Sequence, residues 1–372
     1  MRTRKQLYQE TVQHFLAPVR KYLEDPDISE IMINGHDNIY VESKGKLTQV
    51  TNPDELFPSE QALESAMRNV VQFTGKRLIP ENPSIEARLP DGSRVHVVQA
   101  PAAGEKLCAT IRKFFENRIG MGELVEKKSM TQEAREFLEL CVLIKKNVIV
   151  SGGTGSGKTT LLNCLSSVIQ KDERIIVLED STELELQQDH VLSFEVQPGD
   201  RNGRGAISIR DLFRASLRMR PDRIIVGECR GGEALDMIQA MTSGHSGSLS
   251  TCHANTPRDA LGRLEVMALM SGVDLPLFAL RAQVASAVDV VVQISRMHSG
   301  DRKITCISEV MPLEDDLKYR VRDIYKLGKF STNLDAALPD LEWTGNSVTF
   351  GEELSYSGLT EQVALTGKVW EQ

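Results

Sequence analysis

The sequence feature that most constrains the fold of this chain is a glycine-rich stretch, Gly152–Thr159. It reads GGTGSGKT and matches the pattern G-x-x-x-x-G-K-[ST]. An apolar segment at 147–151 precedes it, and a helical pattern follows it to about residue 170. Glycines let successive backbone N–H groups turn inward around an anion, and the positive end of the following helix dipole points at the same place. The stretch therefore predicts a phosphate-binding loop between a buried strand and a helix.

This loop predicts that the chain binds ATP together with Mg²⁺. Lys158 is expected to reach the β- and γ-phosphates, and the Thr159 hydroxyl is expected to bind the metal ion. The alternatives are a chance match and a glycine turn with a purely structural role. The residues expected to contact the nucleotide are Gly153, Thr154, Gly155, Ser156, Gly157, Lys158, Thr159, Thr160 and Arg230.

Strand and helix patterns alternate from residue 129 to residue 330. Near-continuous apolar strands are expected at 147–151, 174–179, 223–228, 248–252 and 289–295. Helices are expected at about 131–145, 158–170, 208–219, 231–242, 257–271 and 276–287. This alternation predicts an α/β domain at 129–330 whose mostly parallel sheet is covered on both faces.

The residues before this domain show a different organisation. A polar helical pattern covers 1–25, and a second helical pattern covers 59–75. Two hairpins are predicted, one with its turn at 44–46 and one with its turn at 91–92. We therefore expect a smaller α+β domain at 1–115 with a leading helix.

Two further segments complete the predicted organisation. The stretch 116–128 contains two glycines and many charges, which is typical of a linker between domains. Residues 331–372 lack a clear periodicity and are expected to form a loosely packed C-terminal appendage.

Composition and charge limit the setting in which the chain works. The formal net charge is −8, which does not favour stable nucleic-acid binding. None of the six cysteines forms a CxxC pair, which favours a reducing cytosol over a disulfide framework. The start of the chain has no signal-peptide pattern, and no apolar run approaches the roughly 20 residues that cross a bilayer. We expect a cytoplasmic protein that reaches a membrane only as a peripheral partner of other proteins.

Carboxylates lie at and just after the end of the strand predicted at 174–179, where open α/β sheets bind their ligands. They belong to Glu179, Asp180 and Glu183. Such groups can orient water or help to hold Mg²⁺ beside the γ-phosphate, and Glu179 is assigned to this role, partly through water. The alternative is a solvated acidic loop.

The strand predicted at 223–228 ends at a second acidic position. Gly227 stands where many phosphate-loop enzymes carry an aspartate, and Glu228 comes next. A glutamate at this distance suits activation of the attacking water, so Glu228 is predicted to be catalytic. The alternative is a carboxylate that only favours the N-terminus of the next helix.

A histidine lies on each side of the strand predicted at 248–252. His245 precedes it and His253 follows it, and both are predicted to take part in the reaction. A histidine beside the γ-phosphate can respond to its presence and to its loss. Gly244 and Gly247 allow a close approach of backbone or phosphate. The usual alternative is a buried structural histidine. A metal site is a weaker alternative, because beyond Cys252 no carboxylate or cysteine has suitable spacing.

Arginines can stabilise the negative charge that develops during γ-phosphate transfer. The first domain places three of them in or beside predicted strands, namely Arg88, Arg94 and Arg112. An arginine finger typically changes a rate by about 10³–10⁵. All three are therefore candidate catalytic residues.

Four motifs occur in an order that resembles the type II/IV secretion ATPase superfamily. They are the loop at 152–159, the acidic group at 179–183, LRMRPDRIIVGECRGGEALDMIQAM at 217–241, and SGHSGSLSTCHAN at 243–255. The first-domain segments VRKYLEDPDISEIMINGHDNIYVESKGKL and EARLPDGSRVHVV look like its Tad/Flp-pilus branch, the CpaF/TadA type. The resemblance covers about residues 19–325.

The resemblance implies a RecA-like second domain joined to the α+β domain by a flexible linker. It also implies a cytoplasmic homo-hexamer docked on an inner-membrane pilus platform protein. The acidic group would match the family's Asp box, Gly227-Glu228 its atypical Walker B motif, and the two histidines its His box. Arg88, Arg94 and Arg112 fall where the family supplies arginines to the nucleotide, within one subunit or between two.

The leading hypothesis is an ATP-hydrolysing motor that powers assembly or retraction of a Tad/Flp-type type IV pilus. ATP binding would close the two domains about the linker, and hydrolysis would reopen them. The alternatives are a traffic ATPase of type IV secretion, a nucleotide-gated scaffold with little turnover, and a DNA translocase, which the negative charge disfavours.

Overall fold

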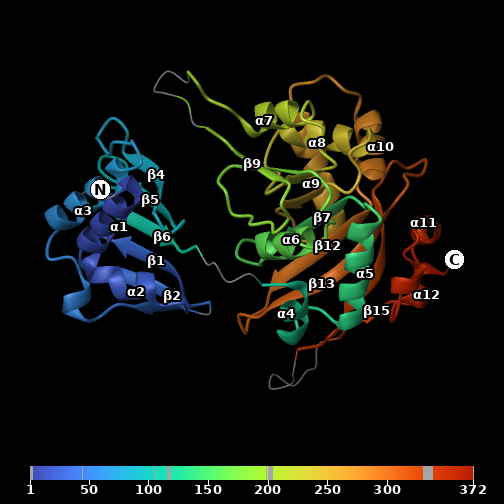
Figure 1. The fold of residues 1–372 in the computed structure, drawn as a ribbon, viewed down its shortest axis with the longest axis horizontal. Coiled ribbons are helices and arrows are strands. Elements are labelled where there is room, and N and C mark those ends of the chain that lie inside the picture. The colour runs from blue at the N-terminus through green and yellow to red at the C-terminus, as the bar shows by residue number, and fades with distance from the viewer. Residues whose placement is uncertain are drawn as a thin grey trace. The chain divides into compact units, whose positions relative to one another are not determined.

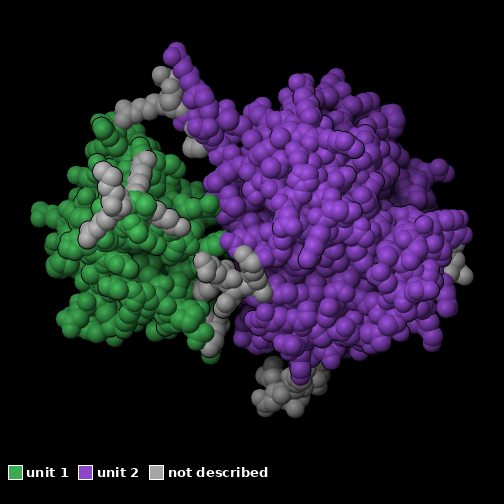
Figure 2. Space-filling model, in the orientation of Figure 1, with its two compact units in different colours: residues 1–118 green, residues 119–372 purple. Residues whose placement is uncertain are grey.

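The computed structural model describes residues 3–43, 45–104, 106–114, 119–197, 199, 204–329 and 338–371. The chain forms two compact units, residues 1–118 and residues 119–372, which Figure 2 shows in different colours. Each unit has its own hydrophobic core, so each one can be understood by itself.

The first unit is built on a sheet of six antiparallel strands, counted over its described residues. Its order is β3-β2-β1-β6-β5-β4. The strands are β1 Ile28–Asn34, β2 Ile39–Ser43, β3 Lys46–Gln49, β4 Ser84–Arg88, β5 Arg94–Val98 and β6 Cys108–Arg112. Both predicted hairpins are confirmed, since β2 pairs with β3 and β4 with β5. Lys44, in the first turn, lies outside the described residues.

The described α-helices of the first unit are α1 Arg4–Phe15, α2 Arg20–Glu24 and α3 Glu60–Gln72. Helix α3 is confirmed as predicted, and the Ser59 hydroxyl caps it by accepting a hydrogen bond from the Ala62 N–H. The single helix predicted over 1–25 is wrong. The chain leaves the α-helix after Phe15, because Pro18 has no N–H to donate and disfavours helical geometry in the residue before it.

The second unit is built on a sheet of nine strands, counted over its described residues, in the order β15-β14-β13-β12-β7-β11-β10-β8-β9. The strands are β7 Val148–Gly152, β8 Ile175–Glu179, β9 Val191–Glu195, β10 Arg223–Val226, β11 Leu249–Cys252, β12 Val290–Arg296, β13 Arg302–Met311, β14 Arg320–Leu327 and β15 Leu341–Trp343. Neighbours from β12 to β9 are parallel, which confirms the predicted parallel sheet. Strands β13 to β15 extend it as antiparallel neighbours, and sequence patterns did not identify them.

Helices surround this sheet, as Figure 1 shows. They are α4 Met121–Glu126, α5 Gln132–Leu143, α6 Lys158–Ser166, α7 Ile209–Ser216, α8 Glu233–Thr242, α9 Pro257–Leu269, α10 Leu277–Ala287, α11 Gly351–Tyr356 and α12 Gly367–Trp370. Among the helices that the structure describes in either unit, none combines the length and the apolar content that crossing a bilayer requires.

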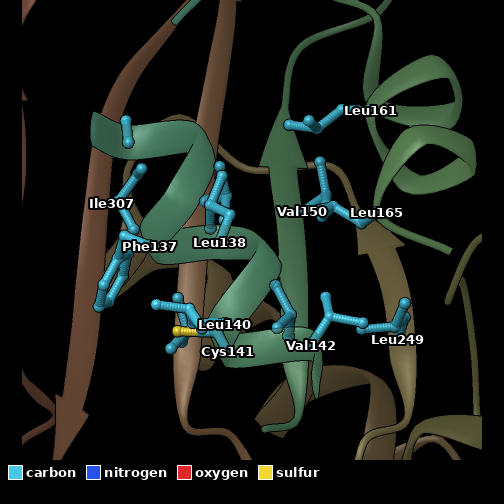
Figure 3. Close-up of a cluster of buried hydrophobic side chains, with 14 of the residues drawn as sticks. Phe137, Leu138, Leu140, Cys141, Val142, Val150, Leu161, Leu165, Leu249 and Ile307 are labelled. Carbon is cyan, nitrogen blue, oxygen red and sulfur yellow. The ribbon is translucent and has the colours of Figure 1, made fainter. Parts of the chain in front are cut away.

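Hydrophobic cores cover both faces of the second sheet. Val148 and Val150 of β7 belong to one core and Ile149 to the other, because successive side chains of a strand point to opposite faces. The first core also contains Leu138 of α5 and Leu165 of α6 (Figure 3). Helices α7 to α10 contribute to the second core. The two layers of helices hold the carboxyl ends of the parallel strands in a fixed arrangement.

The linker predicted at 116–128 is too long. The boundary between the units falls after residue 118, and Met121 and Leu124 of α4 are buried in the first core of the second unit. Residues 116–118 lie outside the described residues. The many charged residues of this stretch made it resemble a linker, although Met121 and Leu124 have helical spacing. Burial of these two side chains packs α4 against the second unit.

The structure also corrects the expectation of a loosely packed appendage, over its described part at 338–371. Trp370 packs against Phe137 of α5 with ring centroids 5.3 Å apart. The Glu136 carboxylate accepts hydrogen bonds from the N–H groups of Leu365 and Thr366, each at 2.9 Å. These short elements bury only a few residues each, so no single period dominates the sequence. Residues 331–337 lie outside the described residues.

Candidate functional site

The carboxyl ends of four parallel strands bring the phosphate loop, the acidic residues and His253 to one edge of the second sheet. Cys252 of β11 pairs with Ser151 of β7, and Val226 of β10 pairs with Leu178 of β8. The phosphate loop follows β7, His253 follows β11 and Glu228 comes two residues after β10. Parallel sheets bind ligands at this edge, because the loops that follow their strands meet there.

The phosphate loop has the backbone geometry that its glycines permit. Gly155 and Gly157 adopt φ values of 68° and 97°, a region that side chains rarely enter. A Cβ on Gly152 would lie 2.3 Å from the Ile294 carbonyl oxygen, so this position also requires glycine. The Ser156 hydroxyl closes the loop by donating to the Gly153 carbonyl at 2.8 Å. The loop therefore forms a cradle at the start of α6 that fits a phosphate group.

The remaining threonines of the predicted nucleotide set lie on this loop and in the first turn of α6, whereas Arg230 lies on another loop. Thr154 is exposed on the phosphate loop, and Thr159 and Thr160 are half-buried in the first turn of α6. Arg230 comes from the loop after β10.

Lys158 is buried and folds back over the loop. Its ammonium donates to the Gly153 carbonyl oxygen at 3.0 Å and lies 3.3 Å from His253 Nδ1. Burial, and next the charge of Lys158, lower the pKa of His253, against the opposing effect of the Glu228 carboxylate. His253 is therefore predominantly neutral at neutral pH and can accept a hydrogen bond from the ammonium.

Glu228 lies between two nitrogen-bearing side chains. Its Oε2 pairs with Arg230 at 2.5 Å, and Arg230 also pairs with Asp180 at 3.2 Å. Its Oε1 lies 2.8 Å from His253 Nε2. This approach is not directed as a hydrogen bond, and within the described residues the buried Oε1 accepts none. One continuous row of titratable side chains thus lies along this edge of the sheet, and we call it the charged row. Its members are Lys158, His253, Glu228, Arg230 and Asp180.

The Glu179 side chain lies over Gly227. It fills the space that the side chain of an aspartate at position 227 would occupy. It is buried, and its Oε1 accepts hydrogen bonds from the N–H groups of Glu183 at 2.9 Å and Leu184 at 3.0 Å. A Cβ on Gly227 would lie 2.8 Å from the Glu179 Cγ. Position 227 must therefore be glycine, because any larger residue would displace the Glu179 side chain. Glu179 in turn holds the backbone of the acidic loop through its two hydrogen bonds.

Replacing Gly227 by alanine is expected to displace Glu179 and to destabilise the protein by about 1–3 kcal/mol, as overpacking does in a dense interior. Gly262→Ala in α9 is the matched control, because, apart from its chain neighbours and the backbone of its own helix, a methyl group added at Gly262 would meet no atom of the described residues within 4 Å. It is expected to stabilise the protein by about 0.5–1 kcal/mol, because helical glycine is entropically costly. Denaturant unfolding measures the free energy of unfolding of both variants. An unchanged free energy of unfolding in Gly227→Ala would contradict the steric argument.

The structure does not bring His245 to the phosphate loop of its own chain. His245 precedes β11, so the strand separates it from His253 by roughly 13 Å at the usual rise per residue. Gly247 serves a structural purpose there, because a Cβ on it would lie 2.4 Å from a guanidinium nitrogen of Arg223. Arg223 is fully buried and forms a bidentate pair with Glu173 at 2.9 Å. Only the histidine after β11 joins the row of charges.

The first unit aligns its three candidate arginines on one rung of its sheet. Arg88 pairs with Arg94 across β4 and β5, and Arg94 pairs with Arg112 across β5 and β6. Glu30 of β1 is the next partner of Arg112. Cross-strand partners lie on one face, so residues that are far apart in sequence form a continuous basic row. Such a row is suited to bind an anion.

Sequence reasoning missed several residues that shape the site. The Glu233 carboxylate accepts hydrogen bonds from the Arg230 and Gly231 N–H groups at 2.7 and 2.8 Å, which holds the loop after Glu228. Gln293 donates to the Ala254 carbonyl at 3.2 Å, next to His253. The missed residues also include Arg296 and Arg302. For Gln293, Arg296 and Arg302 no spacing rule indicates a place beside the phosphate loop, because they reach it only when β12 pairs with β7.

Comparison with known proteins agrees with this arrangement. The family described as Type II/IV secretion system protein matches residues 12–334 of this chain. The type IV secretion system protein PtlH of Bordetella pertussis is 36% identical over 314 residues, which cover 77% of this chain and 91% of PtlH. The type IV secretion system protein VirB11 of Brucella suis is 31% identical over 318 residues, which cover 78% of this chain and 87% of VirB11.

A solved structure supports the fold class. The pilus retraction motor PilT with bound ADP has a TM-score of 0.57 to this chain at 19% identity, covering 81% of this chain and 84% of PilT. At this identity the likeness concerns the fold alone. The prediction of an α/β fold with a RecA-like phosphate-loop domain and a smaller α+β N-terminal domain is confirmed.

Proposed function

This chain belongs to the type II/IV secretion system protein family, and we propose that it is an ATP-hydrolysing motor of a pilus or secretion machine. The observation that carries the proposal is the charged row at the phosphate loop. It places a lysine, a neutral histidine and a buried carboxylate oxygen that accepts no hydrogen bond from the described residues beside one phosphate cradle. These are the groups that hydrolysis of a triphosphate needs.

Each residue of the charged row has a separate role in the proposed reaction. Lys158 exchanges its contacts with Gly153 and His253 for the β- and γ-phosphates, to which its charge is attracted. Glu228 accepts a proton from the attacking water through Oε1, while the water oxygen bonds to the γ-phosphorus. The bond from that phosphorus to the bridging oxygen then breaks, and ADP leaves with the electron pair. Arg230 holds the Glu228 carboxylate in place through Oε2.

Mg²⁺ would be held by hard oxygen donors, which the Thr159 hydroxyl and, partly through water, the Glu179 carboxylate supply. Its charge would neutralise that of the phosphates. Glu179 itself is oriented by the two backbone N–H groups of the acidic loop. The side chains fit this role by donor chemistry, and the Gly227 position leaves Glu179 the room it needs.

The assembly that we propose is a cytoplasmic homo-hexamer, peripheral at the inner membrane through a pilus platform protein. The basic row of Arg88, Arg94 and Arg112 would supply arginine to the γ-phosphate of the same or a neighbouring subunit. His245 would act across a subunit boundary if it acts at all, because the strand β11 separates it from its own phosphate loop. Stable nucleic-acid binding is not part of this proposal.

Three functions are candidates for this chain within the family. The first-domain segments favour assembly or retraction of a Tad/Flp-type type IV pilus. The names of PtlH and VirB11 favour a second candidate, a traffic ATPase of type IV secretion. A nucleotide-gated scaffold with little turnover is the third, and the buried Glu228 Oε1 argues against it.

The proposal is tested by steady-state phosphate release from the purified full chain, followed by replacement of the native gene with the Glu228→Gln version. We expect Mg²⁺-dependent ATP hydrolysis in the assay and loss of surface pili in cells. Intact pili with loss of protein or DNA export would select type IV secretion instead. Nucleotide binding without measurable phosphate release would select the scaffold.

A further inference from the structure

Two arginines that no sequence motif identified lie against the phosphate loop. Strand β12 pairs with β7 up to Ile294 and Gly152, so the end of β12 lies beside the first residue of the loop. The chain then turns through residues 297–301 into β13. This hairpin makes Arg296 and Arg302 direct cross-strand partners, and we call them the arginine pair.

The arginine pair touches the loop at its glycines. The Arg302 Nε donates a hydrogen bond to the Gly155 carbonyl oxygen at 3.2 Å. A Cβ on Gly157 would lie 3.0 Å from the Arg302 Cδ, and a Cβ on Gly155 would lie 3.7 Å from an Arg296 guanidinium nitrogen. Two guanidinium groups are therefore held within reach of the loop that is built to receive phosphate.

The strand order decides which part of a nucleotide the arginine pair meets. Strand β7 lies between β12 and β11, so the arginine pair and the charged row lie on opposite sides of the loop. A triphosphate whose γ-phosphate faces Glu228 and His253 extends its α-phosphate away from them, toward β12. The arginine pair lies on that side.

Charge gives the arginine pair a reason to bind an anion. A phosphate oxygen between two guanidinium groups accepts charge-assisted hydrogen bonds from both.

We infer that Arg296 and Arg302 bind the α-phosphate of the nucleotide, on the side of the loop opposite the reacting phosphate. The inference rests on the proposed ATP-binding function and adds a subsite to it. These residues strengthen the binding of ATP and ADP alike, because the α-phosphate does not change during hydrolysis. Their loss therefore raises the dissociation constant and leaves the turnover of the saturated protein nearly unchanged.

The test is calorimetry of Mg-ADP and of inorganic tripolyphosphate with the full-length Arg296→Gln and Arg302→Gln proteins, together with kcat at saturating ATP. Glutamine keeps the side-chain atoms out to Cδ, so the part of residue 302 that lies beside Gly157 is retained. Each variant is expected to bind both ligands about 10- to 100-fold more weakly, as the loss of hydrogen bonds to a charged group implies. Its kcat should stay within about twofold of the wild type.

Arg218→Gln is the matched control, because Arg218 is exposed in the segment that precedes β10, at the opposite edge of the sheet. Unchanged affinity in both variants, or a lower kcat at unchanged affinity, would overturn the inference. Weaker ADP binding with normal tripolyphosphate binding would assign the arginine pair to the nucleoside and overturn it as well. If the wild type and Arg218→Gln bind no nucleotide, the proposed function itself fails. If Arg302→Gln does not fold, Arg296→Gln decides, since no hydrogen bond between the Arg296 side chain and the loop is among the contacts on which the inference rests.

Discussion

Replacing Lys158 by alanine is expected to reduce ATP turnover at least about 100-fold, as the loss of a preorganised positive group at a reacting phosphate does. Lys158 is the buried ammonium of the charged row, held between the Gly153 carbonyl and His253. Both partners are neutral, so these contacts cost little to give up when a charged phosphate arrives. Steady-state phosphate release measures the effect.

The control for this experiment is Lys171→Ala, which removes an exposed lysine after the end of α6. It should leave turnover unchanged. Circular dichroism should show both variants folded, because alanine is the residue most compatible with the helix that Lys158 begins. Turnover of Lys158→Ala close to that of the wild type would remove the phosphate loop from the mechanism.

Replacing Glu228 by glutamine is expected to leave nucleotide affinity nearly intact while lowering kcat by about 10²–10⁴, the usual contribution of a general base. The amide keeps the shape of the side chain and can still accept a hydrogen bond from Arg230, but it cannot take a proton from water. The separation of binding from turnover is the signature of a group that acts only in the transition state. Calorimetry with Mg-ADP and single-turnover hydrolysis measure the two quantities.

Glu352→Gln provides the matched control, since Glu352 is an exposed carboxylate on α11. Equal losses of affinity and turnover in Glu228→Gln would mean that Glu228 only holds Arg230 and the loop behind it. Glu228→Asp adds a second reading, because it keeps the carboxylate but shortens the side chain. Partial activity in that variant, with none in Glu228→Gln, would support proton transfer.

The sequence located the phosphate loop and most of the parallel sheet because both depend on local patterns. The glycines at 155 and 157 are needed for backbone angles within the loop itself, so their spacing is a local requirement. The strands β7, β8, β10, β11 and β12 are buried on both faces and contain the apolar runs that the sequence patterns identified. Trp370 and its neighbours could not be recognised in this way, because their burial depends on α5, more than two hundred residues away in the chain.

Local residue chemistry, therefore, determined that this chain carries a phosphate loop, a glutamate after the third strand of the series and a histidine after the fourth. Tertiary structure decided which of the candidates meet. Strand pairing joined His253 to Lys158 and Glu228, left His245 at the far end of β11, and aligned three arginines on one rung. It also brought Arg296 and Arg302 to the loop. The physical reason is that side-chain identity and short-range periodicity can be read directly from neighbouring residues in the sequence. The order and register of strands, in contrast, set the distances between residues that are far apart in the sequence.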